Sequence, residues 1–357
     1  MIYTQSNETV FVGHPDRICN QIGAAILREA MSKDKATRAG IEVCGGKGKI
    51  FVTGEMRTRA DIDVDAITRK VLTACGVNSV QYVIENNIGM QSADIALGVD
   101  IGGAGDQGDI FGAACNDNEF WLPDAQMILQ DFVMKYYDMQ KKNPDSLYPD
   151  GKAQITGEYD GRSRRLVKIK KVVISYQNAE EGADFRKRWD KEVRRVFQEI
   201  AESYGYKVGD NAFLINPTGK FKIGGFDGDA GVLGRKLVVD GYQGFFRTSG
   251  GATAGKDASK VDFSAAMKAR ALAKRVVFDG AKWAEVQLSY CIGKKQPTGI
   301  MVLTDTGYKE VPEEWYEECE PARMIKDLRL NDMDFVQLAM FGNFGRYEKE
   351  YFRGMRC

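Results

Sequence analysis

The chain is poor in the residues that build metal centres and disulfide frameworks. It has one histidine, His14, in 357 residues, which excludes sites that need several imidazoles. Its seven cysteines are scattered without a CxxC pair, which argues against a zinc cage or a disulfide framework and favours a reducing cytoplasm. No run approaches ~20 apolar residues, so we expect no membrane span. The start, MIYTQSNETVF, lacks the basic and apolar regions of a secretory signal.

Neither sign of charge is in excess. The 50 basic residues balance the 50 acidic ones, so we expect no general polyanion-binding surface and no nucleic-acid partner. With 28% charged and 43% hydrophobic residues, the composition is that of a globular protein. The length corresponds to two or three domains.

A strand–helix–strand plan occurs three times along the chain. Each predicted helix has apolar residues at three- and four-residue spacing, as in Val193, Val196 and Ile200. Sheets covered on one face by helices would bury these residues. The pattern predicts an α/β (α+β) fold of three β-α-β-type subdomains with pseudo-threefold symmetry, with elements at 49–58, 61–76 and 80–87, at 170–178, 185–205 and 211–219, and at 235–244, 264–280 and 284–293.

Two regions break this plan. Around 104–165 the periodicity is lost, with the turn-rich stretch KKNPDSLYPDGK at 141–152. The glycine-dense stretch 244–262 also reads as loop. We expect these regions to hold the unusual chemistry.

The stretch GHPDRIC places the single histidine beside a predicted helix start. Pro15 fits the first turn of a helix whose apolar period continues through Ile18 and Ile22. His14 and Asp16 then lie at the helix N-terminus, where backbone N–H groups attract anions and a carboxylate can hold a metal shared with an anion. The alternative interpretation is that Asp16 is only a first-turn acid and His14 only a cap.

Basic residues recur in glycine-punctuated loops, mixed with aspartates. Basic side chains on loops are usually solvated, but this mixture indicates a polyphosphate and divalent-metal site. The stretch GGATAGKD fails as a P-loop because Asp257 replaces the metal-binding hydroxyl. The basic residues are Lys152, Lys220, Arg235, Lys236, Lys256 and Lys260, and the acidic ones are Asp150, Asp229, Asp257 and Asp262.

Taken in order, long segments resemble the S-adenosylmethionine synthetase (methionine adenosyltransferase) family. The resemblance spans nearly the whole chain and is carried by NETVFVGHPDRICNQI, VTGEMRT, GAGDQGDIFGAA, YPDGKAQIT, VVISYQNAEE, FLINPTGKFKIGGFDGDAGVLGRKLVVDGYQG, GGATAGKDASKVDFSAA, VQLSYCIG and FGNFGR. It implies synthesis of S-adenosylmethionine from ATP and methionine with Mg²⁺ and K⁺. It also implies a cytoplasmic homodimer with active sites at the interface, with a tetramer as the alternative.

The resemblance also implies roles for individual residues. His14 would hydrogen-bond the leaving triphosphate, Asp16 and Asp262 would bind magnesium, and Glu42 would bind potassium. The phosphate and nucleotide contacts would be Lys152, Arg235, Lys236, Lys256 and Lys260, joined by Lys220, with Asp106, Asp150 and Phe221 at the nucleoside and Glu55, Leu97 and Asp229 at methionine.

Subdomain boundaries are expected to interleave. We predict that residues 1–12 and about 105–210 interleave with 13–104, and that 211–357 form a C-terminal subdomain.

The chain departs from the family pattern on the methionine side. Leu97 replaces a usual glutamine, which removes one hydrogen-bonding partner of the amino-acid end, and only Asp100-Ile101-Gly102 stand where relatives carry a longer loop. Two alternatives therefore stay open. One is adenosyl transfer to another thioether or mainly triphosphate hydrolysis, and the other is a catalytically silent regulatory subunit.

Overall fold

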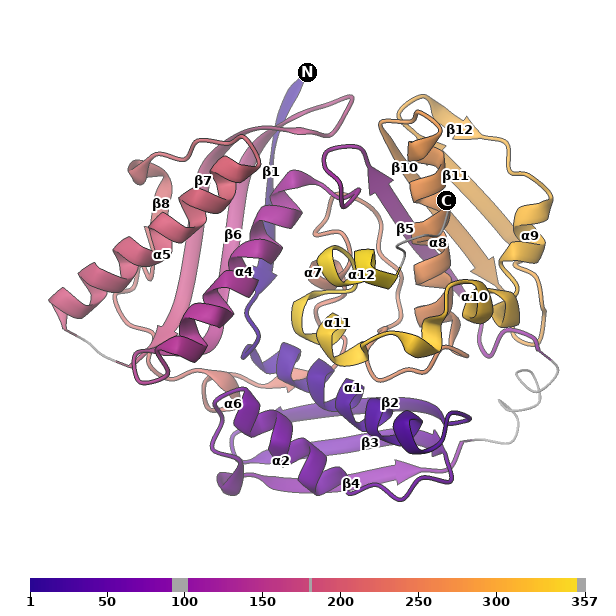
Figure 1. Cartoon of the computed structure of the whole chain (residues 1–357), viewed down its shortest axis with the longest axis horizontal. Helices are drawn as coiled ribbons and strands as arrows, with labels where there is room; N and C mark the ends of the chain where they lie inside the picture. Colours follow the sequence, from indigo (N-terminus) through magenta and orange to yellow (C-terminus); the bar gives the residue numbers. More distant parts are fainter. Residues whose placement is uncertain (92–101, 180–181, 352–357) are drawn as a thin grey trace.

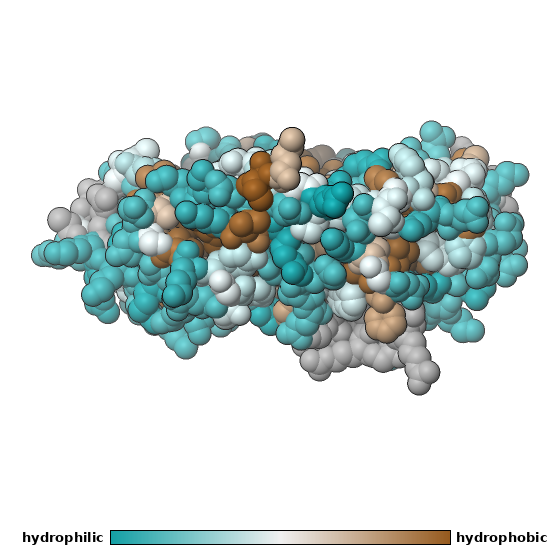
Figure 2. Space-filling view, turned by 90° about the horizontal axis from the view of Figure 1, so that it is seen from above, coloured by the Kyte–Doolittle hydropathy of each residue, from teal (hydrophilic) through white to brown (hydrophobic). Residues whose placement is uncertain are grey.

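Three four-stranded sheets surround the centre of the molecule (Figure 1). The structure is a computed structural model and describes residues 1–91, 102–179 and 182–351. Helices cover one face of each sheet. Viewed edge-on in Figure 2, the molecule is a flat slab whose rim is mostly hydrophilic. This architecture confirms the predicted fold class.

The first sheet has the strand order β4-β3-β2-β9. Its β3 and β4 are parallel and joined through helix α2, so the first predicted strand–helix–strand unit is confirmed. Helix α1 packs on the same sheet and starts at Pro15, as predicted. The elements are α1 (Pro15–Lys33), β2 (Arg38–Gly46), β3 (Lys49–Arg57), α2 (Val64–Ala74), η1 (Ser79–Gln81), β4 (Val83–Gly89) and β9 (Gly231–Val232).

The second sheet has the order β1-β6-β7-β8. Its β7 and β8 are parallel and joined through helix α5, which confirms the second predicted unit. Helices α4 and α5 pack together on one face (Figure 1). The elements are β1 (Ile2–Val10), α4 (Asp124–Lys142), β6 (Leu147–Asp160), β7 (Leu166–Asn178), α5 (Ala183–Ser203), η2 (Asp210–Ala212) and β8 (Phe213–Ile215).

The third sheet has the order β12-β11-β10-β5, with antiparallel pairing throughout. Helix α8 lies so close to β5 that a Cβ on Gly112 would meet the backbone of Ala269 at 2.1 Å. The elements are β5 (Gly108–Cys115), α8 (Val261–Phe278), β10 (Trp283–Tyr290), β11 (Gly299–Thr304), β12 (Gly307–Lys309), α9 (Glu314–Glu318), α10 (Pro321–Asp327) and η3 (Leu330–Asp332).

The third predicted unit is wrong in its first strand. Residues 235–244 contain the short helix α7 (Leu237–Asp240) and turns, not a strand. The β-branched pair Val238-Val239 suggested extended backbone, but Asp240 is buried against α1 and paired with Arg17 at 2.7 Å. That buried ion pair folds the segment back toward α1. The strand that does pair with β10 is β5, from far earlier in the chain.

Two other expectations about irregular regions need correction. The span 104–165 contains β5, α4 and β6, and β6 begins at Leu147, inside the predicted turn region 141–152. Pro149 is accommodated because the pairing of β6 with β7 is irregular between Leu147 and Gly151. Its carbonyl instead accepts a hydrogen bond from the Gly13 N–H at 2.9 Å. The stretch 244–260 is loop and turn, as predicted, and α8 starts at Val261, three residues before the predicted helix.

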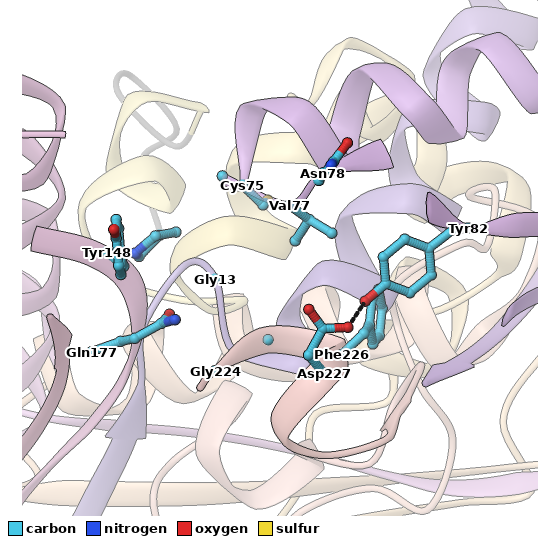
Figure 3. A pocket seen from close by; sticks show the side chains of 13 residues that line it. Gly13, Cys75, Val77, Asn78, Tyr82, Tyr148, Gln177, Gly224, Phe226 and Asp227 are labelled. Atoms are coloured by element: carbon cyan, nitrogen blue, oxygen red, sulfur yellow. Dashed lines mark hydrogen bonds between the residues drawn. The ribbon is translucent and has the colours of Figure 1, made fainter. Parts of the chain in front are cut away.

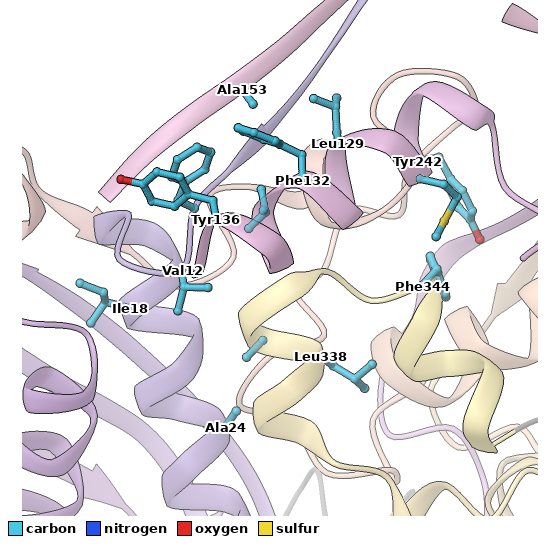
Figure 4. Packing of buried hydrophobic residues seen from close by; sticks show 14 of the residues in the cluster. Val12, Ile18, Ala24, Leu129, Phe132, Tyr136, Ala153, Tyr242, Leu338 and Phe344 are labelled. Carbon is cyan, nitrogen blue, oxygen red and sulfur yellow. The ribbon is translucent and has the colours of Figure 1, made fainter. Parts of the chain in front are cut away.

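The main core lies where α1, α4 and the C-terminal helices meet (Figure 4). Phe132 of α4 is fully buried and lies 5.3 Å, ring to ring, from Phe197. Truncating such a ring to alanine costs about 3–5 kcal/mol. The remaining short helices fill the centre of Figure 1 or border it: α6 (Gly225–Gly228), α11 (Phe335–Phe341) and α12 (Arg346–Tyr351). None of the helices in the described part of the chain has the length and apolarity needed to cross a bilayer.

Candidate active site

Strand β2 has one buried face and one open face. Ile41 and Val43 are 0% and 2% exposed and pack on the side of α1. Because side chains alternate along a strand, Gly40, Glu42 and Cys44 belong to the opposite face. Two groups of predicted site residues border this open face.

His14 caps the N-terminus of α1. Its Nδ1 accepts a hydrogen bond from the Asp16 N–H at 3.2 Å, so the other ring nitrogen, Nε2, carries the proton. Burial, followed by the positive charges of Lys152 and Lys236, lowers the pKa of His14 to about 3 against the opposing charge of Asp16. The imidazole is therefore a neutral hydrogen-bond donor at the helix N-terminus.

Asp16 is a fully buried carboxylate at the centre of the first group. Its oxygens accept from Lys236 Nζ at 2.6 Å, Arg235 Nε at 2.8 Å and the Val232 N–H at 2.9 Å. Although burial alone raises it, the pKa of Asp16 is lowered because these three donors stabilise the carboxylate. The group thus joins the start of α1 to the end of β9 and the residues that follow it.

A buried polar network holds the segment that carries Arg235 and Lys236. Asp240 is paired with Arg17 at 2.7 Å and accepts from Asn20 Nδ2 at 2.9 Å. Asn20 in turn accepts from the Gly234 N–H at 2.9 Å. Arg235 and Lys236 are therefore held in position by the contact of Gly234 before them and the contacts of Asp240 after them.

The second group surrounds Glu42. Lys256 Nζ lies 2.5 Å from Asp262 Oδ2, and Lys256 pairs with Gly40 of β2 through a β-bridge. Desolvation and the negative charge of Asp262 raise the pKa of Glu42, while Lys256 lowers it. Gly251 lies directly against Asp262, because a Cβ at position 251 would stand 2.1 Å from Asp262 Oδ1 and would require that side chain to move. The loop before α8 therefore approaches the carboxylate closely.

Glu55 and Lys260 continue this group along the neighbouring strand. Lys260 Nζ donates to Glu55 Oε1 at 2.9 Å, and Gln91 Nε2 donates to the same oxygen at 3.1 Å. A single carboxylate thus receives two donors from distant parts of the chain. Gly40 faces both Glu55 and Lys260, which places them beside the second group.

Asp150 is a buried acid on β6 with an unusual titration. Its Oδ2 accepts from the Gly225 N–H at 2.8 Å. Burial and the negative charge of Asp229 raise the pKa of Asp150 to about 6, although the neighbouring Lys152 and two backbone N–H groups oppose the shift. Asp229 ends α6 and lies 3.8 Å from Arg235. Asp150, Lys152 and Asp229 therefore adjoin the first group.

Three further predicted residues, Asp106, Lys220 and Phe221, belong to other segments of the chain. Asp106 accepts from its neighbour's backbone at Gln107, and it lies just before β5 in the third sheet. Lys220 and Phe221 stand in the loop after β8, where the Phe221 carbonyl accepts from the Asn178 N–H. Leu97 lies outside the described residues.

Sequence reasoning missed the residues that hold the cations in place. Arg17, Asn20 and Asp240 carry no predicted role, yet together they anchor the segment 234–236. The three-residue spacing of Arg17 and Asn20 puts them on one helix face, which was the available signal. Nothing in the sequence around 240 identified their partner.

The carboxylates of the site could hold magnesium only together with oxygen atoms of a bound phosphate. Within the described part of the chain, no cluster of three or more potential ligand side chains exists. Magnesium in proteins is commonly held by one or two carboxylates together with substrate phosphates. Asp16 and Asp262 each offer one carboxylate among basic side chains, which fits that arrangement.

Sites for phosphate groups typically combine a helix N-terminus with basic side chains. This site has both: a neutral histidine at the start of α1, and an arginine and lysines around single carboxylates. The fold is thus of the α/β class, and the chemistry of the site suits phosphate groups. The chain belongs to the S-adenosylmethionine synthetase family: its N-terminal domain model matches residues 2–96, its central domain model 101–221 and its C-terminal domain model 223–353.

Family membership supports transferase activity of the methionine adenosyltransferase type in general, with ATP and methionine as substrates. The family is generally dependent on Mg²⁺ and K⁺. The roles of individual residues and the subdomain boundaries stay predictions.

Proposed function

We propose that this protein forms S-adenosylmethionine by direct displacement. The methionine sulfur attacks the 5′ carbon of ATP, a sulfur–carbon bond forms, and the carbon–oxygen bond to the triphosphate breaks. The whole triphosphate leaves and is then hydrolysed to pyrophosphate and phosphate in the same site. The observation that carries the proposal is the convergence of His14, Asp16, Arg235 and Lys236 at the start of α1.

His14 is suited to stabilise the leaving group without a proton transfer. Its Nδ1 is occupied by the Asp16 N–H, so Nε2–H is the donor that remains for an oxygen of the triphosphate. Arg235, Lys236 and Lys152 add positive charge around the same place. Donors held in advance toward a developing negative charge lower the barrier without reorganisation.

The second group would receive the far end of the triphosphate and the amino acid. Lys256 stands beside Asp262 and Glu42, which suits phosphate binding. The carboxylate of Glu55 in this group and that of Asp229 beside the first group fit the ammonium group of methionine. Asp150, also beside the first group, and Phe221 fit the nucleoside. Lys220, Lys260 and Asp106 complete the proposed nucleotide contacts.

Asp16 and Asp262 would hold magnesium, and Glu42 would hold potassium. When bound, these ions neutralise phosphate charge and orient the triphosphate. Lys236 and Lys256 pair with these two carboxylates, so each carboxylate has a cation beside it that could also contact a phosphate.

A homodimer would complete the site. Three apolar side chains stay exposed on strands of the first sheet: Phe51 at 37%, Val83 at 55% and Val232 at 39%. A second copy packed on this open face would cover them, because an exposed apolar patch on a sheet favours an interface. Sedimentation of Val83→Lys tests this: we expect loss of the dimer and of activity together, whereas an active monomer would refute it.

The reaction itself is tested by incubating the protein with ATP, methionine, Mg²⁺ and K⁺ and identifying products by mass spectrometry. We expect S-adenosylmethionine with pyrophosphate and phosphate, and a loss of about 100-fold or more in His14→Ala. Lys33→Ala, at the exposed other end of α1, is the matched control and should keep full activity.

The outcomes separate the alternatives. ATP that stays intact with methionine but reacts with a larger thioether would identify another acceptor. Phosphate release without a sulfonium product would identify triphosphate hydrolysis. A protein that does neither but binds an active relative would be a regulatory subunit.

A further inference from the structure

Two cavities adjoin the segments that carry the candidate site. One, of about 210 Å³, lies beside Gly13 and the turn of α6, and none of the described residues that line it carries a proposed catalytic or binding side chain (Figure 3). The other, of about 20 Å³, is lined by Asp262 and also by Thr253 and Asn343. A cavity of this size can hold about one water molecule. These three polar side chains therefore border one small space at the edge of the second group.

The backbone of Asn343 is bonded to the segment that carries Lys236. The Asn343 N–H donates to the Asp240 carbonyl at 2.9 Å, and the Asp240 N–H donates to the Lys236 carbonyl at 2.8 Å. Lys236 in turn meets the carboxylate of Asp16 at 2.6 Å. Two successive backbone hydrogen bonds thus link Asn343 to a cation of the first group.

The side chain of Asn343 is bonded to the loop that carries Lys256. Thr253 Oγ1 donates to Asn343 Oδ1 at 2.8 Å. Two residues before Thr253, Gly251 lies against the Asp262 carboxylate, and three residues after it, Lys256 pairs with the same carboxylate. Thr253 therefore stands between the two points at which this loop contacts Asp262, and its hydroxyl ties the loop to Asn343.

Asn343 is itself anchored by the residues beside it. The ring of Phe344 is buried and stacks on the ring of Tyr242, with centroids 4.9 Å apart, and Figure 4 shows both within the main core. Gln130 Nε2 on α4 donates to the Phe341 carbonyl at 3.1 Å and to the Phe344 carbonyl at 2.9 Å. A residue locked in this way by packing and hydrogen bonds can fix the position of the segments that it contacts.

We propose that Asn343 is a positioning residue that holds the Lys236 segment and the Lys256 loop at a fixed separation. The inference rests on the proposed function, in which one triphosphate contacts both groups. A chain of phosphates gains from two groups of cations only where their spacing matches its own, because charge attraction falls with distance. A single phosphate reaches one group and has no such requirement.

The test measures binding of diimidotriphosphate, a tripolyphosphate analogue that resists hydrolysis, to the full-length protein with Mg²⁺ by calorimetry. Inorganic phosphate is measured as its competitor. Thr253→Val removes the donor of the hydrogen bond, and Asn343→Ala removes the acceptor. We expect each variant to bind the analogue about 3- to 10-fold more weakly, the effect of one hydrogen bond, and to bind phosphate as the wild type does. The double variant should bind no more weakly than either single one, because both lose the same bond.

Controls separate positioning from mere stability. Thr253→Ser keeps the hydroxyl and should keep wild-type affinity, as should Thr306→Val, which removes an exposed hydroxyl in the turn after β11. Variants with a lower melting temperature but wild-type affinity for the analogue would overturn this inference alone, and so would equal weakening of the analogue and phosphate, which indicates damage within one group. Wild-type protein that does not bind the analogue would overturn the proposed function together with this inference.

Discussion

Replacing Glu348 by glutamine tests an ion pair that is almost fully buried. Arg270 is 0% and Glu348 1% exposed, and the Arg270 Nε and Nη2 donate to the two carboxylate oxygens at 3.0 and 3.2 Å. Lys274 Nζ lies 3.7 Å from the same carboxylate, and the Gly345 N–H donates to it at 3.1 Å. The arginine also bonds three backbone carbonyls, so it has no route to water when its partner is lost.

The expected cost is set by the charge left behind. Removing one partner of a buried pair leaves an uncompensated cation and typically costs 3–5 kcal/mol. We expect Glu348→Gln to lose about that much in denaturant unfolding followed by tryptophan fluorescence. The double variant Arg270→Met with Glu348→Leu removes both charges and should be less destabilised than the single one. The reasoning would be refuted if Glu348→Gln lowered the free energy of unfolding by less than about 1 kcal/mol, or if the double variant were less stable than the single one.

The same variant should also reduce activity, because Glu348 anchors a segment that touches two site loops. The Asn343 N–H donates to the Asp240 carbonyl at 2.9 Å, and Thr253 Oγ1 donates to Asn343 Oδ1 at 2.8 Å. These contacts join the segments that carry Lys236 and Lys256. A destabilised variant that keeps full activity below its unfolding transition would show that the segment does not position them.

Three further outcomes follow from the described contacts. Arg275 and a neighbouring lysine lower the pKa of Glu318 to about 2, although burial alone would raise it. The carboxylate therefore stabilises the fold above pH 4.5, and this stabilisation is lost as the pH falls toward 2. Glu318→Gln should lower the free energy of unfolding by about 3 kcal/mol at pH 7 and by nearly nothing near pH 2, as measured by urea unfolding. Burial raises the pKa of Asp117 to about 6, so the folded protein binds a proton there more tightly than the unfolded chain does. The wild-type protein should therefore lose roughly 3 kcal/mol of its free energy of unfolding as the pH rises from 4 through 6. An Asp117→Asn variant that shows the same loss would contradict this. Gly251→Ala should displace Asp262 and reduce turnover by about 10-fold or more, with little change in melting temperature. Unchanged kinetics would show that the loop before α8 does not approach Asp262 closely.

Much of the fold could be predicted because its signals are local. Helix α1 starts at Pro15 with His14 as its cap, and the parallel units β3-α2-β4 and β7-α5-β8 follow the predicted order. Periodicity and end signals depend on neighbours within about two helical turns, so they are readable along the chain. The failed strand at 235–244 had the right local signal, and a contact with α1 overrode it.

The candidate site was predictable in its residue types but not in its pairings. The sequence supplied His14, Asp16 and the loop lysines as candidates. It could not indicate that Asp16 meets Arg235 and Lys236, because these pairs are separated by more than 200 residues. The network of Asn20 with Asp240 was invisible for the same reason.

The sequence by itself determined the class of fold, the family resemblance and the chemistry available to the site, because motifs and periodicity are properties of short segments. Only the tertiary structure decided which charges meet. It placed β9 beside β2 and β5 beside β10, and it brought Asp16 next to Arg235 and Lys236. The physical reason is that burial and electrostatic pairing depend on distances between segments, which local sequence does not encode.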